Sequence, residues 1–71
     1  MTVIHYNRIK AVLAEKGKSN IDLARALQVA EQTVSLWCTN RRQPPIERLY
    51  AISQVLKVNI RDLLVPTHWE E

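Results

Sequence analysis

The chain has 71 residues and a formal net charge of +3 at pH 7. We expect a single domain over residues 1–71, because a chain this short buries only about 60% of its unfolded surface. One cysteine excludes an internal disulfide and a Cys-based zinc site, and two distant histidines lack metal-ligand spacing. No apolar run approaches the ~18 residues that would span a bilayer. We therefore expect a cytoplasmic protein without cofactor, metal or membrane contact.

The first residues, Thr2–Tyr6, are β-branched and aromatic, which suits a short strand or an ordered arm. A helix is expected next, roughly from Arg8 to Lys16, with Asn7 as its N-cap. Gly17, the only glycine, fits the left-handed residue that ends a helix. Helical spacing gives this helix an inner stripe of Ile9, Val12 and Leu13.

The stretch Ser19–Asn40 predicts two short helices joined by a tight turn. Ser19 and Asp22 form a capping-box-like pattern at the start of the first helix. The turn falls at Gln28 and Val29, and the second helix runs from about Ala30 to Thr39. This layout is typical of a helix-turn-helix unit, whose second helix lies in the DNA major groove. The inward residues at helical spacing are Leu23, Ala24 and Leu27, then Val34 and Trp37.

After Asn40, which can adopt the positive φ that usually requires glycine, comes the sequence RRQPP. It contains no apolar anchor, so we expect a surface loop. Pro45 suits the first position of a helix that extends to about Leu56. Its expected core residues are Ile46, Leu49, Ile52, Val55 and Leu56.

The chain then offers a last short helix, Ile60–Leu64, which Asn59 and Asp62 would cap. Val58 is expected to close the end of the core. The fold class is therefore all-α: five short helices around one core of about residues 7–64. A small antiparallel pair between Thr2–Tyr6 and Val65–His68 is the alternative at the termini.

By their order, these segments resemble the lambda-repressor-like, or Cro-type, helix-turn-helix family, also called the XRE family. The matching stretches are NRIKAVLAEKGKS, LARALQVAEQTVSLW, NRRQPP and IERLYAISQVLKVNIRDLL, which together cover about Asn7 to Leu64. The resemblance implies a compact five-helix domain that binds double-stranded DNA. The helix from about Ala30 to Thr39 would then read the major groove.

Several positions depart from the family pattern. Gln28 and Asn40 stand where relatives often have glycine, and Asn20 replaces a glutamine. Many relatives also pair an arginine on the first helix with a glutamate at the end of the third. Leu13 and Cys38 occupy those two places, and we predict that their side chains touch.

The outward residues of the Ala30–Thr39 helix are the candidate base readers. The Gln32 amide can form a bidentate pair with adenine, and Glu31 can accept from cytosine N4 or simply favour the positive end of the helix. Thr33 and Leu36 could pack on thymine methyl groups, and Ser35 is a weaker candidate. The alternative for each is an ordinary solvated surface residue.

The candidate phosphate contacts lie at two other places. Asn20 resembles the family's phosphate-binding position, where its amide and the helix-end N–H groups could hold one phosphate. Arg41 and Arg42 would contact the DNA backbone or the edge of the same groove. The alternative for the two arginines is a flexible, solvated loop.

The sequence contains no arrangement typical of an enzyme active site. The expected function is a sequence-specific DNA-binding transcriptional regulator, a repressor that blocks polymerase. One such module buries little surface, so we expect a homodimer on two half-sites, with Leu64, Val65 and Trp69 as candidate dimer contacts. The alternative is a protein-interaction module on the same fold with a protein partner, such as the antitoxin of a toxin–antitoxin pair.

Overall fold

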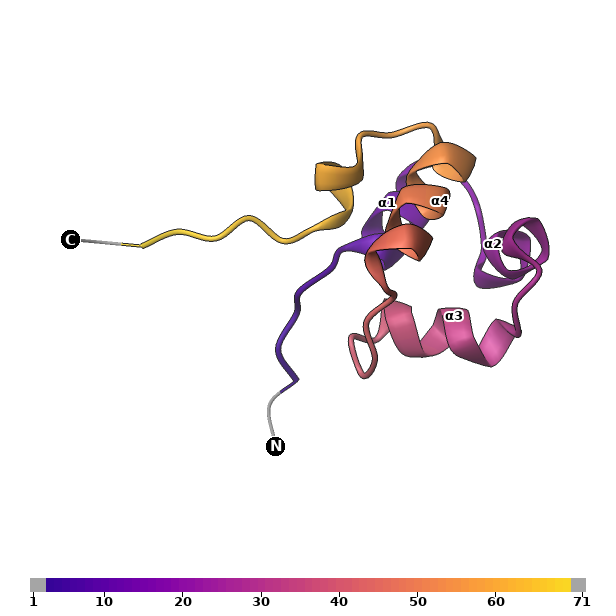
Figure 1. Cartoon of the computed structure of the whole chain (residues 1–71), viewed down its shortest axis with the longest axis horizontal. Helices are drawn as coiled ribbons and strands as arrows, with labels where there is room; N and C mark the ends of the chain where they lie inside the picture. Colours follow the sequence, from indigo (N-terminus) through magenta and orange to yellow (C-terminus); the bar gives the residue numbers. More distant parts are fainter. Residues whose placement is uncertain (1–2, 70–71) are drawn as a thin grey trace.

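The computed structural model describes residues 3–69, which form four α-helices and one 3₁₀ turn (Figure 1). The described residues contain no strand, so the predicted all-α class is confirmed, with a 3₁₀ turn as the fifth element. Thr2 lies outside the described residues. No helix within 3–69 is long and apolar enough to cross a membrane. The elements in chain order are α1 (Ile9–Glu15), α2 (Asn20–Leu27), α3 (Glu31–Cys38), α4 (Ile46–Leu56) and the 3₁₀ turn η1 (Ile60–Leu63).

One apolar core joins all five elements, and Val29, Ala51, Val58 and Ile60 pack against its edge. The prediction that Ile46 and Val55 belong to it is wrong, because both are exposed. Successive residues of a helix are turned by about 100°, so these two fall at the margins of the buried stripe on α4. The buried apolar side chains are Ile9, Val12, Leu13, Leu23, Ala24, Leu27, Val34, Trp37, Cys38, Leu49, Ile52, Leu56 and Leu63.

The helix starts are capped in two ways. At α2 the predicted capping box is complete: Ser19 Oγ accepts from the Asp22 N–H, and Asp22 Oδ2 accepts from the Ser19 N–H. That backbone hydrogen bond from Ser19 lowers the pKa of Asp22. At α1 the predicted cap is displaced, because Arg8 is the N-cap. Asn7 still satisfies an opening amide, since its Oδ1 accepts from Ile9 N at 3.1 Å.

Each α-helix is followed, within two residues, by a residue with a left-handed backbone, and only one of these four residues is glycine. Gly17 follows α1, Gln28 follows α2, Asn40 follows α3 and Lys57 follows α4, with φ between 57° and 65°. The next amide bonds back to the last turn of the helix in every case, which is the Schellman pattern. The left-handed positions predicted at Gly17 and Asn40 are therefore confirmed.

The two terminal segments meet once and then separate. Asn7 and Leu64 form an isolated antiparallel bridge, flanked by the Val65 N to Tyr6 O and Arg8 N to Leu63 O hydrogen bonds of 2.9 Å. The chain ends then diverge (Figure 1), so within residues 3–69 the alternative of a terminal strand pair reduces to this bridge.

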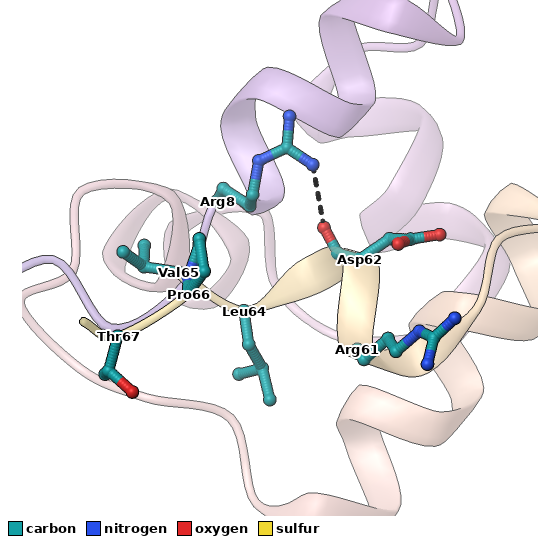
Figure 2. Close-up of a pocket in the computed structure, with 7 residues that line it drawn as sticks. All are labelled: Arg8, Arg61, Asp62, Leu64, Val65, Pro66 and Thr67. Carbon is teal, nitrogen blue, oxygen red and sulfur yellow. Dashed lines mark hydrogen bonds between the residues drawn. The ribbon is translucent and has the colours of Figure 1, made fainter. Parts of the chain in front are cut away.

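The beginning of the C-terminal segment borders an open hollow of about 540 Å³ (Figure 2). Arg8 reaches across from the start of α1 and donates to the backbone oxygen of Asp62 at 3.0 Å. Beyond this point the segment carries exposed apolar side chains, and Trp69 is 79% exposed. The hollow lies at the C-terminal segment, and its lining includes no residue of α3.

Candidate nucleic-acid interface

Helix α3 lies along one edge of the domain, where no other helix covers its outer side (Figure 1). It packs mainly against α2 and also contacts α1. Val34, Trp37 and Cys38 are buried on its inner side, as their helical spacing predicts for the first two. The remaining residues of α3 are therefore the ones that an approaching ligand can meet.

The candidate base readers divide into two groups by exposure. Glu31 and Gln32, in the first turn, are exposed, whereas Thr33, Ser35 and Leu36 are half-buried. Leu36, which was expected to point outward, is half-buried because the packing of α3 covers part of its side chain. No side chain caps the helix start at Ala30, and the first turn of α3 presents the side chains of Glu31 and Gln32 to solvent.

Asn20 is brought to the opposite end of α3. It is the first residue of α2 and half-buried. The Cys38 thiol, on the last residue of α3, donates to Asn20 Oδ1 at 3.4 Å. Burial raises the pKa of this thiol, which keeps it protonated and able to donate. The amide nitrogen of Asn20 remains the donor that could face a phosphate.

Arg41 and Arg42 follow at this same end and are both exposed. Their backbone N–H groups donate to the same acceptor, Leu36 O, at 3.1 and 3.2 Å, which folds the loop back against α3. The expectation that the RRQPP loop has no apolar anchor is wrong, because Pro44 is buried. The two arginines thus project from a loop that is fixed on both sides.

Three amide side chains, which we call the amide clamp, tie this loop to the N-terminal segment: Asn7, Asn40 and Gln43. Asn7 and Asn40 are only 3% and 7% exposed. From the sequence, Asn7 is expected as a cap and Asn40 as a turn residue, and no pattern indicates a role for Gln43. An asparagine at a turn that glycine would also satisfy is the one signal in the sequence that indicates a further role.

In the amide clamp, hydrogen bonds are donated both from the N-terminal segment to the loop and from the loop to the N-terminal segment. Asn40 Oδ1 accepts from the backbone N–H groups of Tyr6 at 2.9 Å and Asn7 at 3.0 Å, and Asn40 Nδ2 donates to Asn7 O at 3.0 Å. Asn7 Nδ2 donates to Trp37 O at 3.0 Å and to Gln43 Oε1 at 2.7 Å. Gln43 Nε2 completes the ring, 3.2 Å from Asn40 Oδ1.

Leu13 and Cys38 are both buried in the shared core. Neither Leu13 nor Cys38 carries the charge that the family resemblance implies at its place, so neither residue needs a charged partner. Their direct contact stays a prediction.

These positions give α3 two polar ends about 12 Å apart, the length of eight helical residues. Hydrogen-bonding side chains, Glu31 and Gln32, stand at its start. Cationic and amide donors, Arg41, Arg42 and Asn20, gather at its end. Among residues 3–69, no group of three or more metal-ligating side chains could hold a metal ion. The arrangement suits a ligand that offers polar base edges beside anionic groups.

Comparison with known proteins bears on what that ligand is. Residues 9–63 match a family model described as helix-turn-helix. A crystal structure of a candidate DNA-binding protein from Bacteroides fragilis is similar, with 40% identity, a TM-score of 0.84 and coverage of 87% of this chain and 100% of that one. A search of curated proteins found no match.

A second similar crystal structure is that of a transcriptional regulator from Listeria innocua. It has 23% identity and a TM-score of 0.71, and the match covers 96% of this chain and 68% of that one. At this identity the likeness shows the fold alone.

Proposed function

The chain belongs to the helix-turn-helix family, in the lambda-repressor-like or XRE group, and we propose that it is a sequence-specific regulator that represses transcription from double-stranded DNA. The observation that carries the proposal is the placement of α3, uncovered along one edge with Glu31 and Gln32 exposed on its first turn. In proteins with this motif, the N-terminal residues of the second helix contact base edges in the major groove.

Sequence would be read from the start of α3. The Gln32 amide offers a donor and an acceptor that match adenine N6 and N7. Glu31 accepts from cytosine N4, while Thr33 and the exposed part of Leu36 pack on thymine methyl groups. Ser35, further along the helix, has the shortest reach of the five.

Position on the duplex would be fixed from the end of α3. Arg41 and Arg42 neutralise phosphates, and Asn20 donates its amide to one phosphate beside the start of α2. These contacts supply affinity without sequence preference. Because base contacts and phosphate contacts would come from different residues, single substitutions can separate sequence preference from overall affinity.

Repression would be steric, with α3 filling a groove that polymerase needs. One module of this size buries little DNA surface, so a homodimer would cover two half-sites about one helical turn apart. Leu64, Val65 and Trp69 are exposed and apolar, which supports the C-terminal segment as the dimer contact.

The test begins with selection of bound sequences from a random duplex pool, followed by titration of variants on the selected and a scrambled duplex. Gln32→Ala should weaken binding to the selected duplex by about 1–3 kcal/mol and relax the choice at one base pair. It should barely change binding to the scrambled duplex, which depends mostly on phosphates. The matched control is Gln54→Ala, which removes an exposed glutamine from α4.

Two results would contradict the proposal at different levels. Equal weakening of both duplexes by Gln32→Ala would show that α3 does not read bases. If the wild-type protein selects no sequence and binds no duplex, the protein-interaction module, such as an antitoxin, takes the place of the regulator.

A further inference from the structure

The loop that carries Arg41 and Arg42 is closed at its base by side chains. Gln43 Nε2 lies 3.4 Å from Asn40 O and 3.2 Å from Asn40 Oδ1, so residues 40 and 43 are tied to each other. The two arginines occupy the tip between them. A four-residue loop with a tied base and an exposed tip holds its tip residues in a narrow range of positions.

The base of the loop is in turn fixed to the body of the domain. Asn7, the one buried residue of the otherwise exposed segment 3–7 before α1, donates to Gln43 Oε1 at 2.7 Å and to Trp37 O at 3.0 Å. Asn40 accepts two backbone N–H groups from the same segment. The amide clamp therefore joins the N-terminal segment to the end of α3 and to the arginine loop, both of which lie 30 or more residues further along the sequence.

Turn geometry alone does not require this network. Asn40 has φ 60°, a conformation that glycine adopts without strain. Gln28 at the end of α2 has φ 58°, and among the described residues its side chain forms no hydrogen bond. The chain thus makes a left-handed turn on each side of α3, and only the turn that leads to the arginines carries a network of amide hydrogen bonds.

We propose that Asn7, Asn40 and Gln43 are positioning residues for DNA binding, which hold the Arg41–Arg42 loop in its phosphate-binding geometry before DNA arrives. This inference rests on the proposed function. Fixing the loop in advance reduces the entropy that is lost when the loop and its long side chains are ordered on binding. The clamp touches no DNA itself and acts through the two arginines.

The experiment compares two glycine substitutions at equivalent turns, Asn40→Gly and Gln28→Gly, together with Gln43→Ala. Each variant is titrated with the selected duplex at several salt concentrations, at a temperature where circular dichroism shows it folded. Asn40→Gly and Gln43→Ala should each weaken binding about 3- to 10-fold. The slope of log affinity against log salt should stay unchanged, because both arginines are retained. Gln28→Gly should bind as the wild type does.

A double-mutant cycle then tests whether the effect passes through the arginines. In a background of Arg41→Ala with Arg42→Ala, Gln43→Ala should cost less than half of its fold-change in the wild type, because the loop no longer has charges to position. A merely structural role of the clamp would give the same fold-change in both backgrounds, and that result would overturn the inference.

Gln43 is exposed, so its variant decides the matter even if Asn40→Gly fails to fold. Wild-type affinity for Gln43→Ala would overturn the positioning role while leaving the proposed function intact. Absence of salt-dependent duplex binding by the wild type would instead overturn the proposed function itself.

Discussion

The turns on either side of α3 have nearly the same backbone and very different surroundings. Gln28 precedes α3 and Asn40 follows it, with φ values of 58° and 60°. Gln28 is exposed, whereas Asn40 is buried and bonded to two backbone amides of the N-terminal segment. Left-handed backbone is unfavourable for both residues relative to glycine. Only Asn40 offsets that cost with hydrogen bonds to other parts of the chain.

This difference is consistent with the two tasks that we propose for the ends of α3. The start, without a side-chain cap, carries the side chains that we propose to contact the edges of bases. The end is held by the amide clamp and by buried Pro44, and it carries the charges that we propose to contact phosphates. Substitutions on the inner face of α3, at its end and at its start are therefore expected to have different effects.

The largest effect is expected from Trp37→Ala, which removes the side chain that packs α3 onto the core. Trp37 is buried on the inner face of α3, and its backbone oxygen accepts from Asn7. The substitution should lower the free energy of unfolding by about 3–5 kcal/mol, enough to unfold much of so small a domain. Thermal denaturation measures it, with Trp69→Ala as the control because Trp69 is 79% exposed. A wild-type melting temperature for Trp37→Ala would show that the core is misassigned.

Leu13→Arg places a charge on α1 beside Cys38, the last residue of α3, which we predict to contact Leu13. An unpaired charge in the buried core should cost about 3 kcal/mol, measured by chemical denaturation. Ala14→Arg, at an exposed position of the same helix, is the control. Addition of Cys38→Glu to Leu13→Arg should recover part of the loss by restoring an ion pair. No recovery in the double variant would mean that the two side chains do not meet.

Gln28→Gly acts at the start of α3 and should stabilise the domain. Glycine removes the strain of the left-handed residue, and part of the gain is lost to the greater freedom of the unfolded chain. The expected net increase in the free energy of unfolding is about 1 kcal/mol, measured by denaturant titration. A decrease would show that the Gln28 side chain contributes to the turn.

The parts of the fold that could be predicted from sequence are those set by local rules. Ser19 and Asp22 cap α2 because the interacting groups are three residues apart. Val34 and Trp37 are buried because helical spacing puts them on one face. Periodicity gives the direction of a buried stripe but not its width, which is why Ile46 and Val55 were assigned to the core although both are exposed.

The amide clamp could not be predicted in this way. Asn7 is separated by 30 to 36 residues from its partners Trp37, Asn40 and Gln43. These groups meet only because the N-terminal segment crosses the end of α3. Pro44 is buried for the same reason: its surroundings come from distant parts of the chain. For the candidate interface, the sequence indicated the arginines and the outward residues of α3, while the means of holding the arginines required the three-dimensional structure.

Salt dependence of duplex binding tests most directly the claim that α3 reads at its start and anchors at its end. Arg41→Ala and Arg42→Ala should each weaken selected and scrambled duplexes alike. Each should also flatten the slope of log affinity against log salt by about 0.9, one phosphate's share. Arg61→Ala, which removes an exposed arginine from η1, is the control and should leave the slope unchanged. Arginine variants that keep the wild-type slope would contradict the claim.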